Sequence, residues 1–83
     1  MEQVARTAKQ IAAAVRRERR LRQMTQAELS KKINLRQATI SRFEKGEEGA
    51  SLQTLLDILA ALNLELVIRL RTKASPKDIE QIF

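Results

Sequence analysis

The segment 37–45 places hydrogen-bonding or small side chains on one helical face, namely Gln37, Ala38, Ser41 and Arg42. In the major groove of DNA, Gln can form two hydrogen bonds with adenine and Arg can do so with guanine, while Ala can contact a thymine methyl group. The pattern therefore predicts a recognition helix in which Gln37, Ala38 and Arg42 read bases. The alternative is an ordinary solvated face of an unrelated small bundle.

The residues before this segment would position it. Thr25 is a good N-cap, and Glu28, three residues later, can accept a hydrogen bond from the Thr25 amide, so the pair predicts a capping box. A helix should therefore run from Gln26 to about Lys32. Asn34 follows where the chain must turn, and Asn readily adopts the left-handed backbone conformation that a turn requires.

A second helix should run from about Gln37 to Lys45 and end at Gly46. The apolar residues of both helices can converge on one core: Ala27, Leu29, Ile33, Leu35, Ile40 and Phe43. Two short helices arranged in this way form a helix-turn-helix, whose second helix enters the major groove. The segment 25–44 therefore predicts binding to double-stranded DNA.

Composition and charge agree with this prediction. The chain has 83 residues with no Cys and no His, which predicts one small domain without disulfides or a zinc site, in the reducing cytoplasm. No apolar run resembles a signal peptide or a membrane span. Residues 1–45 carry 12 Lys and Arg against 4 Asp and Glu, whereas residues 46–83 carry 4 against 6. The basic surplus therefore lies with the recognition element, as a phosphate-binding face requires.

Two further helices should flank the helix-turn-helix. One runs from the cap Thr7 to about Arg22, and its Arg19 is a candidate to form an ion pair with Glu44 of the recognition helix. The acidic loop 47–50 should lie away from phosphates. The other helix covers 52–62, and its apolar face is broad enough to predict contact with a second subunit or with the first helix.

The residues after this helix change period from helical to alternating. Their apolar members are Leu64, Leu66, Val67, Ile68 and Leu70. Alternation predicts a β-strand, and a single strand leaves its amides and carbonyls unpaired. Pairing with the same strand of a second copy predicts a homodimer and hence a palindromic operator. The alternative is that the stretch continues the preceding helix.

The last residues should form a tail, so we expect a DNA-binding and dimerisation domain at 1–71 and a tail at 72–83. Ser75 can cap a short helix and Pro76 suits its first position. The tail ends in the apolar residues Ile79, Ile82 and Phe83, which are candidates for contact with a partner protein.

Three segments together resemble the HipB antitoxins, within the wider group of Xre/Cro-like repressors: TQAELSKKINLRQATISRFEKG, SLQTLLDILAALNLELVIRL and TKASPKDIEQ. The resemblance implies a mainly α, lambda-repressor-like bundle followed by one β-strand that pairs across a homodimer. It also implies a repressor of its own operon that holds a HipA-type serine/threonine kinase toxin inactive. In such a protein Gln26, Arg36 and Ser41 would bind phosphates, and we assign Lys45 to the same group. The chain departs from the family pattern at Asn34, Arg36 and Phe83.

Other functions are weaker fits to the sequence. The chain has no nucleophile and base pair and no metal-ligand cluster, so we expect no enzyme activity and no cofactor. A Xre/Cro-type repressor that acts alone, without a toxin partner, is the alternative within the DNA-binding class. A purely structural interaction module would carry the basic surface incidentally, and its affinity for DNA would then lack the steep salt dependence of phosphate contacts.

Overall fold

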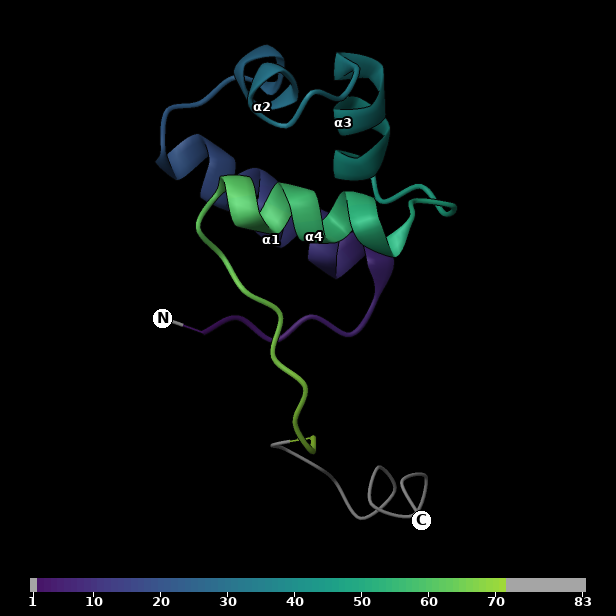
Figure 1. Cartoon of the computed structure of the whole chain (residues 1–83). Helices are drawn as coiled ribbons and strands as arrows, with labels where there is room; N and C mark the ends of the chain where they lie inside the picture. Colours follow the sequence, from purple (N-terminus) through teal and green to yellow (C-terminus); the bar gives the residue numbers. More distant parts are fainter. Residues whose placement is uncertain (1, 72–83) are drawn as a thin grey trace.

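The computed structural model describes residues 2–71, and Figure 1 shows a bundle of helices from which both ends of the chain extend. The helices are α1 (Ala8–Leu21), α2 (Gln26–Lys32), α3 (Gln37–Glu44) and α4 (Leu52–Ala61). Each begins and ends within one residue of the boundary predicted from the sequence. Helix α3 packs against both α1 and α2, which makes it the element that the others hold in place.

Three of the helices begin with the side-chain caps that the sequence predicts. The hydroxyls of Thr7, Thr25 and Ser51 accept hydrogen bonds from the amides of the third residue of α1, α2 and α4. At α2 the capping box is complete, since the Thr25 amide also donates to Glu28 Oε1 at 2.9 Å. Helix α3 differs, because its N-cap Arg36 makes no side-chain capping hydrogen bond.

All four helices end in the same way. The residue after each C-cap has a positive φ, and these residues are Gln23, Asn34, Gly46 and Asn63. At each end the amide of that residue and the next amide donate to carbonyls of the last helical turn, which is the Schellman arrangement. The left-handed turns predicted at Asn34 and Gly46 are therefore confirmed. Those at Gln23 and Asn63 were not foreseen.

The core is formed by the apolar faces of all four helices. Its buried members are Val15, Leu29, Ile40, Phe43, Ile58 and Leu62, with Ile11, Ile33, Leu35, Leu55 and Leu59 packed around them. The outer side of α4 is not covered, because Leu52 is 66% exposed and Leu56 is 39% exposed. Among the described residues of one subunit, the broad apolar face of α4 is thus only partly covered.

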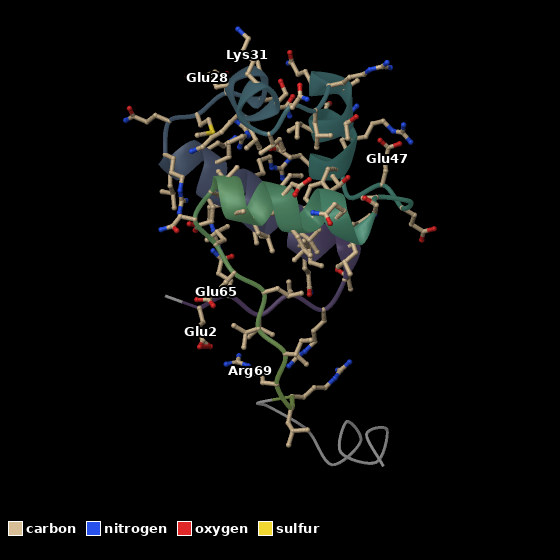
Figure 2. All side chains as sticks on the ribbon, in the orientation of Figure 1. Glu2, Glu28, Lys31, Glu47, Glu65 and Arg69 are labelled. Atoms are coloured by element: carbon tan, nitrogen blue, oxygen red, sulfur yellow. The ribbon has the colours of Figure 1, made fainter. Side chains whose placement is uncertain are left out.

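Residues 64–71 form no strand with any other part of the described chain. They leave the bundle as a single segment that crosses the N-terminal segment (Figure 1), where Glu2 forms an ion pair with Arg69 (Figure 2). The N-terminal segment is also bound to α1, because Gln3 Nε2 donates to Glu18 Oε2 at 3.0 Å. A strand that pairs between subunits needs a second copy, so the predicted strand and dimer stay predictions here.

Candidate nucleic-acid interface

Helix α3 has the two-sided character predicted for a recognition helix. Ile40 and Phe43 are buried in the core, while Gln37, Ala38 and Arg42 are exposed. These three side chains lie on the face of α3 that the helical spacing assigned to them. The polar groups of Gln37 and Arg42 therefore lie at the surface, within reach of a ligand.

The four residues assigned to phosphates occupy two kinds of position. Arg36 and Lys45 are exposed at the two ends of α3, whereas Gln26 and Ser41 are partly buried. Arg36 is also the N-cap of α3 and makes no side-chain capping hydrogen bond. The free amides and the helix dipole at this N-terminus favour an anion. The basic side chains therefore bracket the exposed face of α3.

A buried network fixes the orientation of α3. Arg19 Nε and Nη2 donate to Glu44 Oε2 and Oε1 at 2.6 and 2.9 Å, a bidentate pair between α1 and α3. Arg19 Nη1 also donates to the Met24 carbonyl at 2.6 Å, and Gln26 Nε2 donates to Glu44 Oε1 at 3.1 Å. The predicted ion pair is thus confirmed. No pattern in the sequence indicated that Gln26 would be the third member of this network.

The network controls the protonation of its carboxylate. Burial by itself would raise the pKa of Glu44, but hydrogen bonds from Arg19 and Gln26 outweigh it, together with the charges of Arg19 and Arg16. The pKa of Glu44 therefore lies below its ordinary value, and the same hydrogen bond raises the pKa of Arg19. Both groups stay charged at neutral pH, so α1, α2 and α3 are held together by one ionic junction.

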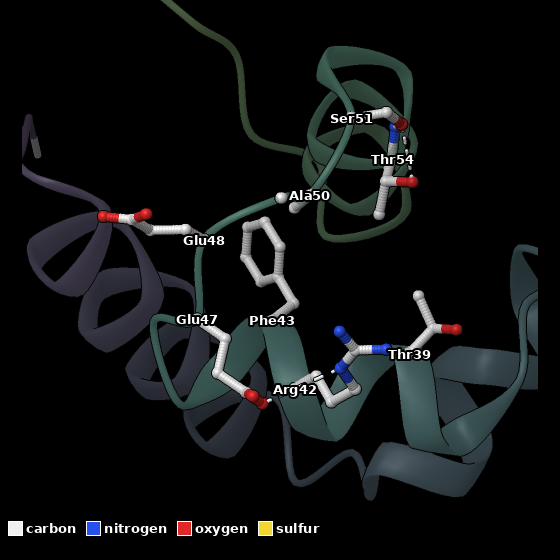
Figure 3. A pocket seen from close by; sticks show the side chains of 9 residues that line it. Thr39, Arg42, Phe43, Glu47, Glu48, Ala50, Ser51 and Thr54 are labelled. Atoms are coloured by element: carbon white, nitrogen blue, oxygen red, sulfur yellow. Dashed lines mark hydrogen bonds and ion pairs between the residues drawn. The ribbon is translucent and has the colours of Figure 1, made fainter.

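The loop after α3 reaches back to the exposed face. The Glu47 carboxylate lies 3.8 Å from Arg42 Nε, and both line a shallow groove with Thr39 and Phe43 (Figure 3). We expected this acidic loop to lie away from phosphates, and that stays a prediction. The structure adds that one of its carboxylates pairs with a residue assigned to base reading. The signal in the sequence was Gly46, because a Schellman ending brings the second residue after the cap over the third-last residue of the helix.

The residues assigned to protein partners are only partly described. Leu66, Val67, Ile68 and Leu70 are exposed, as a dimer surface would be in one subunit, while Leu64 packs against the core. The candidate tail contacts Ile79, Ile82 and Phe83 lie outside the described residues. Within residues 2–71 no group of three His, Cys, Asp or Glu side chains could hold a metal ion, and no helix is long and apolar enough to cross a bilayer.

Comparison with known proteins identifies relatives across most of the chain. A helix-turn-helix family model matches residues 15–68. The antitoxin HipB of Escherichia coli O6:H1 (strain CFT073) is 42% identical over 72 residues, which cover 87% of this chain and 77% of that protein. The antitoxin HipB of Escherichia coli strain K12 is 40% identical over 72 residues, covering 87% and 82% of the two chains.

Solved structures give the same result. A HipB variant in a complex with an O2 20mer superposes with a TM-score of 0.80 at 37% identity, covering 88% of this chain and all of that one. HipB in a HipA-HipB-O2-O3 complex superposes with a TM-score of 0.78 at 38% identity, covering 87% of this chain and all of that one. By sequence and by fold, the chain belongs to the helix-turn-helix family and, within it, to the HipB antitoxins.

Proposed function

We propose that this protein is the DNA-binding antitoxin of a HipBA-like toxin-antitoxin system, that it represses its own operon, and that it neutralises a HipA-type kinase. The observation that carries the proposal is the exposed face of α3, held by the buried junction of Arg19 and Glu44. Membership in the HipB antitoxins supports it, since relatives of this fold are known in complexes with operator DNA and with HipA. The protein acts as a regulator in the cytoplasm rather than as an enzyme.

In this proposal α3 lies in the major groove, where Gln37 and Ala38 contact base edges and Arg42 contacts a guanine. Arg36, Lys45, Gln26 and Ser41 bind the phosphates on either side of the groove. The junction fixes the angle between α2 and α3. Phosphate contacts made by α2 therefore determine how deeply α3 enters the major groove.

A homodimer would present two such faces. Residues 64–70 pair with the same residues of a second copy, and the exposed side chains of Leu52 and Leu56 add to that contact. Two recognition helices about 34 Å apart would then meet successive major grooves of a palindromic operator. Domain 1–71 provides DNA binding and dimerisation, and the tail 72–83 contributes to the toxin complex.

Binding to the DNA upstream of its own gene tests the proposal. After the site is mapped by footprinting, the Gln37→Ala variant should lose about 1 to 3 kcal/mol of affinity on that site and little on random DNA. The Arg36→Ala variant should weaken binding to both DNAs alike and should reduce the salt dependence, because it loses a phosphate contact.

Two outcomes would contradict the proposal at different points. Equal losses from Gln37→Ala and Arg36→Ala on both DNAs would show that Gln37 does not read a base. Isolation of the protein without a kinase, from cells that express its neighbouring genes, would contradict the antitoxin role and leave a repressor that acts alone.

A further inference from the structure

Glu47 occupies its place because of the backbone, not because of its side chain. The Glu47 amide donates to the Arg42 carbonyl at 3.4 Å and the Gly46 amide donates to the Phe43 carbonyl at 3.0 Å. Gly46 has φ +75°, and the chain of Lys9 lies against it so closely that a Cβ would approach Lys9 Cα to 3.0 Å. The turn therefore delivers residue 47 directly over Arg42 whatever its side chain is.

The charge at this position then acts on Arg42. The carboxylate lies 3.8 Å from Arg42 Nε, and the guanidinium extends along α3 between Glu47 and Thr39 (Figure 3). Since the ion pair engages Nε, both terminal NH₂ groups remain available for the O6 and N7 atoms of a guanine. Arg42 is 70% exposed and Glu47 is 49% exposed, so without this partner the long side chain would have few restraints.

The same carboxylate disfavours contacts between this part of the protein and DNA phosphates. A negative charge beside the recognition helix repels the DNA backbone at every sequence, and it weakens the attraction of Arg42 for a phosphate. A guanine in the correct position can still use the two free NH₂ groups. The net effect is a loss of affinity for random DNA, which hydrogen bonds to a correctly placed guanine partly offset.

From these contacts we propose that Glu47 is a positioning residue that sets the base specificity of Arg42, by orienting its guanidinium and by weakening its contacts with phosphates. The inference rests on the proposed role of Arg42 as a base-reading residue. It assigns a DNA-recognition role to a loop residue that does not itself touch a base.

The test compares Glu47→Gln with Glu48→Gln in the full-length protein. Both variants remove one negative charge from the same exposed loop, but in residues 2–71 Glu48 forms no ion pair. Affinities are measured by fluorescence anisotropy on the mapped site, on a panel of duplexes with one base pair changed, and on random DNA. Arg42→Ala and the double variant with Glu47→Gln complete a mutant cycle.

We expect both loop variants to bind random DNA more tightly, and Glu47→Gln by the larger factor, because only that change also releases Arg42 for phosphate contacts. Only Glu47→Gln should reduce discrimination at one base pair, by roughly two- to fivefold, as the strength of an exposed ion pair suggests. In the Arg42→Ala background the Glu47→Gln change should have no further effect on discrimination. Thermal melting of each variant checks that the bundle remains folded.

Three results would overturn the inference. Equal effects of Glu47→Gln and Glu48→Gln on discrimination would show that Glu47 acts only through its negative charge and does not orient Arg42. An effect of Glu47→Gln that persists in the Arg42→Ala background would show that it does not act through Arg42. If Arg42→Ala alters discrimination at no base pair, the base-reading role of Arg42 fails together with this inference, whereas operator binding itself is judged by the Gln37 variant.

Discussion

Replacing Glu44 by Gln should destabilise the whole bundle, because it removes the charge that holds three helices together. Arg19 is 8% exposed and Glu44 is 4% exposed, so the guanidinium would stay buried without a counter-charge. Breaking a buried pair by changing one partner costs about 3 to 5 kcal/mol. Gln keeps one acceptor oxygen for the two Arg19 donors, so we expect the lower end, about 3 kcal/mol.

That loss is large relative to the stability of so small a domain. At roughly 0.05 to 0.15 kcal/mol per residue, a chain of this length has a free energy of unfolding of about 4 to 12 kcal/mol. A loss of about 3 kcal/mol should therefore lower the melting temperature by about 12 °C or more. Thermal and urea unfolding are followed by circular dichroism without DNA, at one fixed protein concentration, because a dimer would make stability concentration-dependent.

The exposed Glu48→Gln variant is the control, since it loses the same charge without losing a buried contact. A loss below about 1 kcal/mol for Glu44→Gln, the range of exposed ion pairs, would refute the argument that this junction holds α3 in place.

The same junction predicts a dependence of stability on pH. The pKa of Glu44 is lowered in the folded protein, so the group stabilises the fold at pH values above its unfolded pKa of about 4.3. This contribution is lost as the pH falls through the folded pKa. The stability difference between the wild type and Glu44→Gln should therefore be constant near neutral pH and shrink below about pH 4.

Three further predictions concern the helix ends and the tail. Gly46→Ala should cost more stability in urea unfolding than Gly49→Ala, because both have positive φ but only at Gly46 would the new Cβ meet Lys9; equal losses would mean that the contact with α1 is unimportant. Gln23→Gly should increase the free energy of unfolding by about 1 kcal/mol, because a left-handed residue without a Cβ carries no strain, whereas Asn63→Gly should gain less; no gain at Gln23 would contradict this account. Deleting residues 72–83 should leave operator affinity nearly unchanged and weaken the toxin complex, as measured by anisotropy and by co-purification; a large loss of DNA affinity would contradict the proposed division of labour.

Much of this molecule could be predicted from the sequence because its signals are local. The capping box of Thr25 and Glu28 depends on residues one helical turn apart, and the stops at Asn34 and Gly46 depend on the conformations open to those residues alone. The exposed face of α3 follows from the 3.6-residue period, which separates Ile40 and Phe43 from Gln37 and Arg42.

Other features were decided by contacts in the folded chain that the residue types alone do not indicate. Gln23 adopts a left-handed conformation that its residue type does not favour, in the turn where Arg19 binds the Met24 carbonyl and stabilises the chain reversal. Gln26 joins the Arg19 and Glu44 pair because α2 and α3 pack side by side, which brings Gln26 to Glu44, 18 residues away in the sequence.

The exposed apolar faces show what the sequence and the tertiary structure each determine. The sequence determined which residues of α4 and of 64–70 are apolar, and the tertiary structure decided that Ile58 and Leu62 are buried while Leu52 and Ile68 are left in solvent. The physical reason is geometric, because residues 2–71 of one subunit supply only enough neighbouring surface to cover one side of α4. Periodicity assigns a residue to a face, but only packing decides what that face meets.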